Sequence, residues 1–579
     1  MGNCKLVEEL NRLRKSSSDS IDGIDDFDEF KKYMHVSRQA EIDLVKILNK
    51  VNESGKKTLV LLCGSAGDGK SHLLSYLKNT KNLLNSYTVY NDATESSAPS
   101  KTAIETLSEA LSRFSDENLD LPGKNFILAI NLGVLSNFIE SSYGKTFTKL
   151  RNYVMENNIL TNQLNINDYD VNSSFQHISF SDYHMFTLTE KGINPNYLQG
   201  ILDKVFITEK DNPFYNTYKS SCKHCSLSEK CPTKHNFEFL TARKNRSYIA
   251  NALGEVIIKN KEILTTREVL NYIYDIVVAQ RFNYKEIAKS SINEVTFLKK
   301  YIRDIMPSLM YEYDDVSALL NQLREFDPLL NRSEQADEYA TFYYVSSNVE
   351  NYIIDVIKDT SYEKVLCQKT SIDKINNDKI LKGEIFNILV RVSDIQQNHN
   401  NEGASIYSEF LEYLYYYNAG IKKKLGKLYA LVEKAIVQWC GSESKDSICF
   451  DDLHHGITLY EHIDFEPHLD NFQERKDEEL GNQHRRLHQR RKRRSKTDCR
   501  ICSNKRIVAV STGKKRPSHL RRSFLTSERR TPSREVGQKE DRFSPVLHRM
   551  VAENKMDRGG KRVKGLPEER AIQLAQYII

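Results

Sequence analysis

A glycine-rich loop between an apolar run and a helix is the feature that most constrains this chain. The run TLVLLC, residues 58–63, is short and apolar, which is typical of a buried strand in a parallel sheet. The next eight residues, GSAGDGKS at 64–71, match the pattern G-x-x-x-x-G-K-[ST] in full, and a helical pattern follows them. Strand, loop and helix in this order predict a phosphate-binding loop at the carboxyl edge of an α/β sheet.

The positions of this loop have a chemical rationale. Gly64 and Gly69 let the backbone bend so that N–H groups face phosphate oxygens, and the helix N-terminus adds a partial positive charge. Lys70 can reach the β- and γ-phosphates, and the Ser71 hydroxyl is a ligand for Mg²⁺. We therefore expect ATP and Mg²⁺ as cofactors, bound by Gly64, Ser65, Ala66, Gly67, Asp68, Gly69, Lys70 and Ser71.

Strands alternate with helices around the loop. Residues 86–92, 124–133 and 174–188 have the pattern of strands, and the stretches between them are helical, which indicates a parallel sheet. After residue 236 the patterns are mostly helical. We predict an α/β fold with an AAA+-like P-loop NTPase core and a helical region after it. The expected parts are a helical segment (1–50), the core (51–210), a cysteine-rich element (211–240), a helical lid and C-terminal helical region (241–475) and a basic tail (476–579).

Hydrolysis of ATP needs an acid that holds Mg²⁺ at the end of a neighbouring strand. Strand order puts Asn131 at the place where this acid is expected, and an amide there can instead sense the γ-phosphate or position the water. The candidates at the strand ends are Asp92, Asn131 and Asp182, and the plain alternative is that they only cap strands.

An arginine of the helical region is a second candidate for contact with the γ-phosphate. Thr266 is expected to cap a helix that has Arg267 in its first turn. Guanidinium suits a sensor because it is planar and permanently charged. The alternative is a solvated surface arginine, and Arg243 and Arg246 are weaker candidates for an arginine finger that acts on another molecule.

A cysteine cluster has the spacing of a metal site, C-x2-C-x5-C-x3-H. Three thiolates and an imidazole make a tetrahedral zinc site, and the polar segment around them lacks a core of its own, which favours structural Zn²⁺. An iron–sulfur cluster with three cysteines and another ligand is the alternative, and unligated thiols are the plain one. The predicted ligands are Cys222, Cys225, Cys231 and His235, with His224 as a spare.

The charge is divided unequally along the chain. Residues 481–579 hold 28 Lys and Arg against 9 Asp and Glu, whereas the first 480 residues have a net charge of −13. High charge with three aromatic residues predicts a disordered tail, although the basic run at 484–496 can bind phosphate backbones. The abrupt change in composition favours a reading-frame change over an evolved DNA-binding arm.

Composition also limits where the chain works. No run approaches the ~18 apolar residues of a spanning helix, and the first residues lack an apolar leader. The ten cysteines are irregularly spaced, which is typical of a reducing compartment. We therefore expect a cytoplasmic protein with no membrane contact.

Linked motifs carry a resemblance over about residues 1–475. They are FKKYMHV (30–36), LLCGSAGDGKSHLL (61–74), NDATES (91–96), KTAIETL (101–107), FILAINLG (126–133), the cysteine cluster and TTREVLNYIYDI (265–276). Their order resembles the DptF family of DNA phosphorothioation-dependent restriction proteins, and the basic tail departs from it.

The resemblance implies a bacterial ATP-binding component of a phage-defence restriction system. Such a component acts with partner Dpt proteins against DNA that lacks the modification, in contact with DNA directly or through the complex. The sequence has no nuclease motif, and it leaves ATP turnover and oligomeric state open. The alternatives are a nucleotide-regulated scaffold with little turnover and a signalling NTPase unrelated to DNA.

Overall fold

A computed structural model gives the fold of two compact units, residues 1–187 with 193–402, and residues 188–192 with 403–579. The structure describes residues 4–18, 27–91, 102–160, 169–260, 264–289, 292–312, 322–330, 334–397, 406–439, 447–453, 457–462 and 507–511.

A four-stranded parallel sheet forms the α/β part of the first unit, as the sequence predicts. Its order is β2-β3-β1-β4, and β1 pairs with β3 and β4 so that Cys63 lies opposite Ile130 and Ser179. The carboxyl ends of these three strands therefore meet at one edge, where ligands bind in sheets of this kind. The strands are β1 (Leu59–Cys63), β2 (Tyr87–Tyr90), β3 (Asn125–Ile130) and β4 (Phe175–Ser179).

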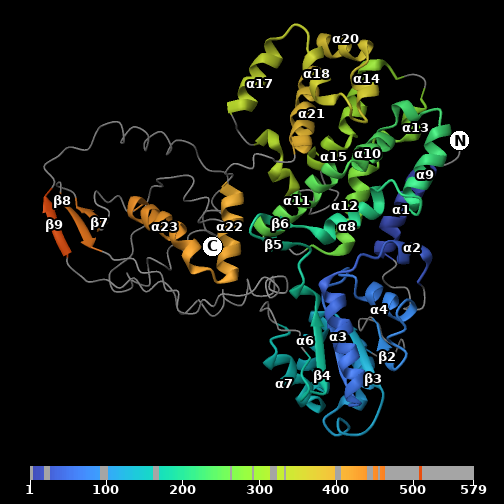
Figure 1. Cartoon of the computed structure of the whole chain (residues 1–579), viewed down its shortest axis with the longest axis vertical. Helices are drawn as coiled ribbons and strands as arrows, with labels where there is room; N and C mark the ends of the chain where they lie inside the picture. The colour runs from blue at the N-terminus through green and yellow to red at the C-terminus, as the bar shows by residue number, and fades with distance from the viewer. Residues whose placement is uncertain are drawn as a thin grey trace. The chain divides into compact units, whose positions relative to one another are not determined.

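Helices cover both faces of this sheet (Figure 1). Successive side chains of a strand point to opposite faces, so Leu59, Leu61 and Cys63 pack with one group of helices and Val60 and Leu62 with the other. Because both faces are covered, β1 is buried along its whole length. The first group is α5 (Ala103–Ala110), α6 (Leu132–Glu140) and α7 (Thr148–Glu156), and the second is α3 (Gln39–Ser54) and α4 (Lys70–Asn79).

The rest of the first unit is mostly helical, as expected after residue 236. A second core joins these helices to α1 (Lys5–Ser18), which packs on α9 and α12, whereas α3 packs on the sheet. The predicted N-terminal segment 1–50 is therefore shared between two cores. The short strands β5 (Thr187–Thr189) and β6 (Gly192–Asn194), which lie at the sequence boundary of the two units, pair with each other. The remaining helices of this unit are α2 (Glu29–Tyr33), α8 (Asn196–Phe206), α9 (Pro213–Ser221), α10 (Pro232–Thr241), α11 (Arg243–Asn260), α12 (Thr266–Val277), α13 (Tyr284–Ile287), α14 (Glu294–Arg303), α15 (Met306–Glu312), α17 (Glu334–Val345), α18 (Glu350–Ile357), α19 (Glu363–Leu366), α20 (Lys369–Asn377) and α21 (Lys379–Gln397).

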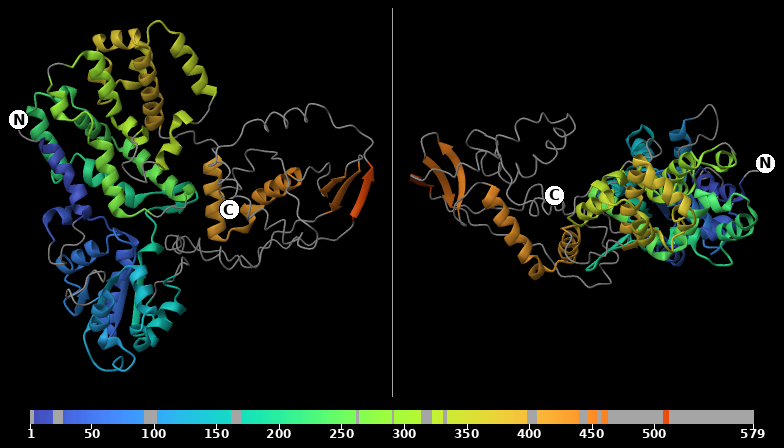
Figure 2. Two further views of the ribbon diagram at one scale, coloured as in Figure 1. Left: turned by 180° about the vertical axis from the view of Figure 1, so that it is seen from behind. Right: turned by 90° about the horizontal axis from the view of Figure 1, so that it is seen from above.

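The second unit corrects two expectations. After α22 (Ile406–Ala419) and α23 (Gly426–Trp439), an antiparallel sheet contains β7 (Ser447–Leu453), β8 (Ile457–His462) and β9 (Ile507–Ser511), drawn in orange and red in Figure 2. The helical region therefore does not continue to residue 475, because β7 and β8 pair antiparallel within it. Strand β9 lies inside the tail predicted to be disordered, and the rest of 481–579 lies outside the described residues.

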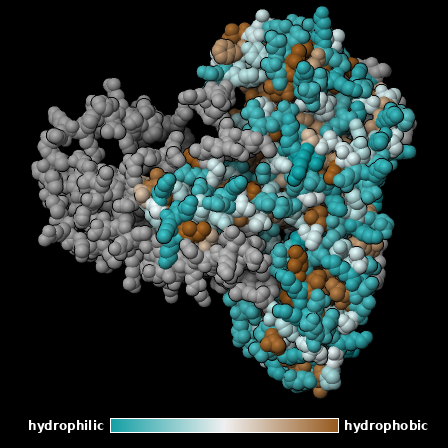
Figure 3. All heavy atoms as spheres, viewed as in Figure 1, coloured by the Kyte–Doolittle hydropathy of each residue, from teal (hydrophilic) through white to brown (hydrophobic). Residues whose placement is uncertain are grey.

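The described surface of the first unit is largely polar. Hydrophilic residues cover most of the face that Figure 3 shows, with small apolar patches between them. Among the described helices, none is both long and apolar enough to cross a membrane.

Candidate nucleotide-binding site

The glycine-rich loop lies between β1 and α4, at the carboxyl edge of the sheet. Gly67 and Gly69 have φ angles of 89° and 90°, in the left-handed region that glycine adopts at low cost. Gly69 is also the N-cap of α4, so the loop leads directly into the positive end of that helix. The loop predicted from the sequence therefore has the backbone that its glycines allow.

Lys70 folds back over the loop. Its Nζ donates to the carbonyl oxygens of Gly64 at 3.1 Å and Ser65 at 2.7 Å, and to Asn131 Oδ1 at 3.2 Å. Asn131 follows β3 and is the N-cap of α6, so strand pairing places its amide beside the loop. The structure thus brings together two of the predicted residues, Lys70 and Asn131.

The hydroxyl of Ser71 has an amide partner that sequence reasoning missed. Ser71 Oγ donates to Asn91 Oδ1 at 2.9 Å, and Asn91 directly follows β2. The signal was present, since Asn91 precedes the candidate Asp92 at the same strand end. Asp92 lies outside the described residues. Asp182 ends a short 3-10 turn after β4 and is buried, but it does not line the pocket.

A second arginine, Arg38, reaches the loop from the segment before α3. Arg38 Nη2 donates to the carbonyl oxygen of Asp68, and its guanidinium lies 4.1 Å from the ring centroid of Phe180. Nothing in the local pattern predicted this contact. Arg38 is also the N-cap position of α3, and the neighbouring Ser37 side chain bonds Glu41.

The carboxyl group of Asp68 is held inside the loop. The Ser65 N–H donates to Asp68 Oδ2 at 2.5 Å. Burial raises the pKa of Asp68, and the neighbouring Lys70 ammonium opposes this shift. The Asp68 carboxylate accepts a hydrogen bond from a loop N–H. A phosphate oxygen bound at the loop would compete with it for this donor.

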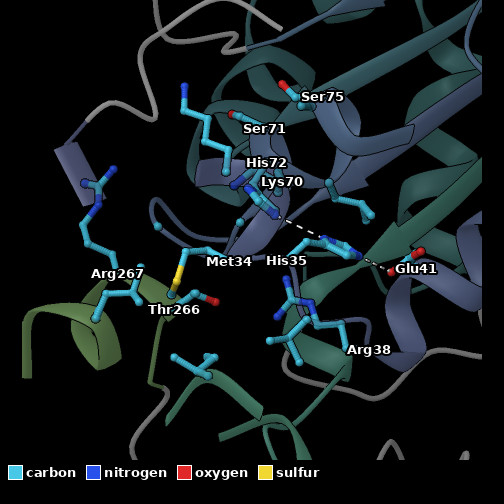
Figure 4. A pocket seen from close by; sticks show the side chains of 18 of the residues that line it. Met34, His35, Arg38, Glu41, Lys70, Ser71, His72, Ser75, Thr266 and Arg267 are labelled. Carbon is cyan, nitrogen blue, oxygen red and sulfur yellow. Dashed lines mark hydrogen bonds and ion pairs between the residues drawn. The ribbon is translucent and has the colours of Figure 1, made fainter. Parts of the chain in front are cut away.

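Helix α12 brings Arg267 to the other side of the loop, as predicted. The Arg267 N–H donates to the Gly67 carbonyl oxygen at 3.2 Å, and a Cβ on Gly67 would lie 2.9 Å from the Arg267 Cβ. Figure 4 shows the Arg267 side chain at the pocket that Lys70 and Ser71 also line. The N-cap of α12 is Thr265, whose capping box with Glu268 replaces the cap predicted at Thr266.

The other two arginines are not at this pocket. Arg246 is 4% exposed and donates to Asp203 at 2.7 Å and to the carbonyl oxygens of Leu240 and Thr241. It is therefore a core residue and does not reach another molecule. Arg243 is exposed at the start of α11 and does not line the pocket.

Apolar side chains line the part of the pocket beyond the loop. They come from the segment before α3, from α8 and from α12, and Tyr197 shares a hydrogen bond of 3.1 Å with Thr266. A pocket that combines cations with apolar and aromatic walls suits a ligand with both kinds of group. The apolar and aromatic residues are Met34, Val36, Tyr197, Ile201 and Leu270.

A chain of hydrogen bonds links three residues that line the pocket (Figure 4). His35 Nδ1 lies 3.2 Å from His72 Nε2, and His35 Nε2 lies 3.1 Å from Glu41 Oε2. Burial lowers the pKa of His72 to about 4, which leaves it neutral at neutral pH. Burial would raise the pKa of Glu41, but hydrogen bonds from His35 and Lys81 outweigh it and lower the pKa to about 2.

The predicted zinc ligands do not form a tight group. No three His, Cys, Asp or Glu side chains of the described residues are gathered closely enough to hold one metal ion. His235 is fully buried, with Nδ1 2.8 Å from the Tyr301 hydroxyl. Zinc held by Cys222, Cys225, Cys231 and His235 therefore stays a prediction that the placement of these side chains does not support.

Comparisons with known proteins found no relative for this chain. No family model matches it, no curated protein matches it, and no solved structure matches it. The resemblance to restriction proteins consequently depends on the sequence motifs alone.

Proposed function

We propose that this chain is an ATP-binding protein whose phosphate site is the loop 64–71. The observation that carries the proposal is the position of the Lys70 ammonium, which lies over the loop at the N-terminus of α4, within hydrogen-bond distance of Asn131. A full charge, a helix N-terminus and a glycine-rich backbone at one point favour a polyanionic group. Arg38 and Arg267 add two further cations from outside the loop.

The apolar lining of the same pocket supports a nucleotide over inorganic phosphate. Met34, Ile201 and Leu270 offer a surface that can cover the flat faces of a base, and Tyr197 adds an aromatic ring. The pocket therefore offers both kinds of contact that ATP needs, cations for the phosphates and apolar surface for the base.

Turnover of ATP is the finer part of the proposal. Arg267 at the loop favours hydrolysis, because a guanidinium there can stabilise charge that develops on the γ-phosphate. Lys70 and Ser71 are bonded to the amides of Asn131 and Asn91. Asn131 at the position expected for the acid favours the alternative, a nucleotide-regulated scaffold with little turnover.

We further propose that the ATP site serves a restriction system that acts on DNA lacking phosphorothioate. This part follows from the resemblance of the motifs, and so do the partner Dpt proteins. The pocket itself supports only the nucleotide.

The test is magnesium-dependent phosphate release by the full chain, measured alone, with DNA, and with an extract that contains the partner proteins. DNA with and without phosphorothioate is compared in parallel. ATP binding with release that rises on unmodified DNA supports the whole proposal. Binding without release under any condition supports the scaffold, and no binding at all overturns both.

A further inference from the structure

Two histidine rings meet at the wall of the pocket, directly after the glycine-rich loop. His72 follows Ser71 in the first turn of α4, and His35 lies in the segment before α3. His72 Nε2 lies 3.2 Å from His35 Nδ1, and both rings line the pocket together with Glu41. The pair therefore adjoins the phosphate loop and faces the same ligand.

Glu41 holds one end of this pair. Its side chain is buried, with Oε2 3.1 Å from His35 Nε2, and Oε1 accepts from Lys81 Nζ at 2.7 Å. Burial alone would raise the pKa of Glu41, but hydrogen bonds from His35, Lys81 and Ser37 lower the pKa to about 2. At neutral pH the carboxylate is therefore ionised and only accepts hydrogen bonds, so the hydrogen between the two groups belongs to His35 Nε2.

The bonds then fix which nitrogen of each ring carries its hydrogen. In a neutral imidazole one nitrogen donates and the other accepts. Because His35 donates through Nε2, its Nδ1 accepts, and the donor of the bond between the rings is His72 Nε2. Burial lowers the pKa of His72 to about 4, so this ring is neutral and its Nδ1 is an acceptor. The assignment is made for pH 8, where neutral imidazole is the ordinary form of histidine.

Contacts between rings hold both histidines in place. The His35 ring stacks on the Tyr76 ring with centroids 3.5 Å apart, and the Phe27 ring lies 5.8 Å from that of His72. Figure 4 shows the bonds that run from His72 through His35 to Glu41. Among the described residues, the Nδ1 of His72 has no hydrogen-bond partner. The pocket wall therefore carries a fixed acceptor that a ligand is free to use.

Apolar side chains flank this histidine pair. Met34 and Val36 stand on either side of His35 in the chain and line the same pocket. A purine base has apolar flat faces and a polar edge, and an apolar wall suits the faces. At the edge, adenine presents a 6-amino group that donates, whereas guanine and hypoxanthine present a 6-oxo group that accepts. An acceptor beside an apolar wall therefore suits adenine.

We propose that His72 Nδ1 accepts a hydrogen bond from the 6-amino group of adenine, which selects ATP over 6-oxo purine nucleotides. His35 and Glu41 act through His72 as positioning residues, because they set which of its nitrogens is the acceptor. The inference rests on the proposed function, ATP bound at the loop 64–71. A 6-oxo group at this position would set an oxygen lone pair against the lone pair of Nδ1, and neither atom would have a donor.

The test is equilibrium binding of three triphosphates to the full chain with Mg²⁺ at pH 8. They are ATP, purine riboside triphosphate, which lacks only the 6-amino group, and inosine triphosphate, which has a 6-oxo group. Loss of one hydrogen bond should weaken binding of purine riboside triphosphate about tenfold, and inosine triphosphate should bind more weakly still. His72→Phe keeps a ring but removes the acceptor. It should lower ATP affinity about tenfold and leave the affinity for purine riboside triphosphate unchanged.

The ratio of the two affinities also separates positioning from packing. His35→Phe retains a ring against Tyr76 but frees the tautomer of His72, so the preference for ATP over purine riboside triphosphate should shrink to about threefold. The control is His184→Phe, because the His184 ring stacks on Phe186 and does not line the pocket. This variant should keep the full preference.

Three results would contradict the inference, and they are distinguishable. Equal affinity of the wild type for ATP and purine riboside triphosphate would overturn it and leave the loop as the phosphate site. Equal weakening of all three ligands by His72→Phe would also overturn it, since the ring would then serve packing or the ribose. A wild type that binds none of the three would overturn the proposed function and the inference with it. The wild-type comparison decides even where a variant does not fold.

Discussion

The two sides of the pocket differ in how the chain builds them. One side is eight consecutive residues, 64–71, held between β1 and α4. The other side gathers Arg38, Asn91, Asn131 and Arg267, which are separated by up to 229 residues and meet only through packing. The first side offers the N–H groups of its own backbone to a phosphate. The residues of the second side are held in position by the elements that pack around them. Substitutions on the two sides should therefore differ in their effects on ATP affinity and on ATP turnover.

The largest effect is expected at Lys70. Lys70→Ala removes the one full charge that the loop itself places at the phosphates, so ATP affinity should fall about 100-fold or more, roughly 3 kcal/mol. Lys78→Ala, in the last turn of the same helix, is the control and should bind normally. Equilibrium binding of labelled ATP measures the affinity of both variants. Equal affinities would show that the loop is not the phosphate site.

Substitution of Arg267, on the opposite side, should lower ATP turnover more than ATP affinity. Arg267→Ala is expected to lower single-turnover phosphate release about tenfold to 100-fold while ATP affinity changes by less than about fivefold, since a sensor mainly stabilises the transition state. Arg243→Ala, an exposed arginine at the start of α11, is the control. Unchanged phosphate release by Arg267→Ala would show that this arginine contributes only to packing.

Gly67 is where the two sides touch, and it offers a way to separate them. Gly67→Ala places a Cβ 2.9 Å from the Arg267 Cβ and imposes a left-handed backbone that costs about 1–2 kcal/mol. We expect ATP affinity to fall about tenfold. Gly133→Ala in α6 has open space around its Cβ and should bind normally. Normal binding by both variants would show that α12 does not need to lie against the loop.

Much of the contiguous side could be predicted from the sequence, and little of the dispersed side. The apolar run 58–63, the glycine pattern and the helix after it specify β1, the loop and α4, because each signal is local. Arg267 was also predicted, from its place at a helix start. Arg38 was not, because its contact with the loop is set by how distant segments pack.

The second unit shows a similar limit. Strands β7 and β8 pair antiparallel where helix was expected, and β9 joins them from 507–511. Pairing of a strand 45 residues further along the chain is not encoded in any local period. The basic composition of 481–579 gave no signal for it.

The smallest effect concerns how stability depends on pH through His72, which lines the pocket. The pKa of His72 is about 4 in the folded chain, against 6.5 ordinarily. Between these values the unfolded chain binds a proton that the folded chain does not, so the stabilisation is full above pH 6.5 and is lost as pH falls toward 4. His72→Gln should reduce the loss of unfolding free energy between pH 7 and pH 5 by about 1 kcal/mol.

Chemical denaturation at the two pH values measures this loss. His184→Gln, whose half-buried ring stacks on Phe186 outside the pocket, is the control. The same pH dependence in wild type and His72→Gln would show that the histidine chain does not support the loop.

The most direct test of the central claim is an equilibrium titration of the full chain with ATP, ADP and adenosine in the presence of Mg²⁺. If the loop binds phosphates, ATP and ADP compete for one site and adenosine displaces neither at comparable concentration. Adenosine that binds as tightly as ATP, or a chain that binds none of the three, would contradict the account.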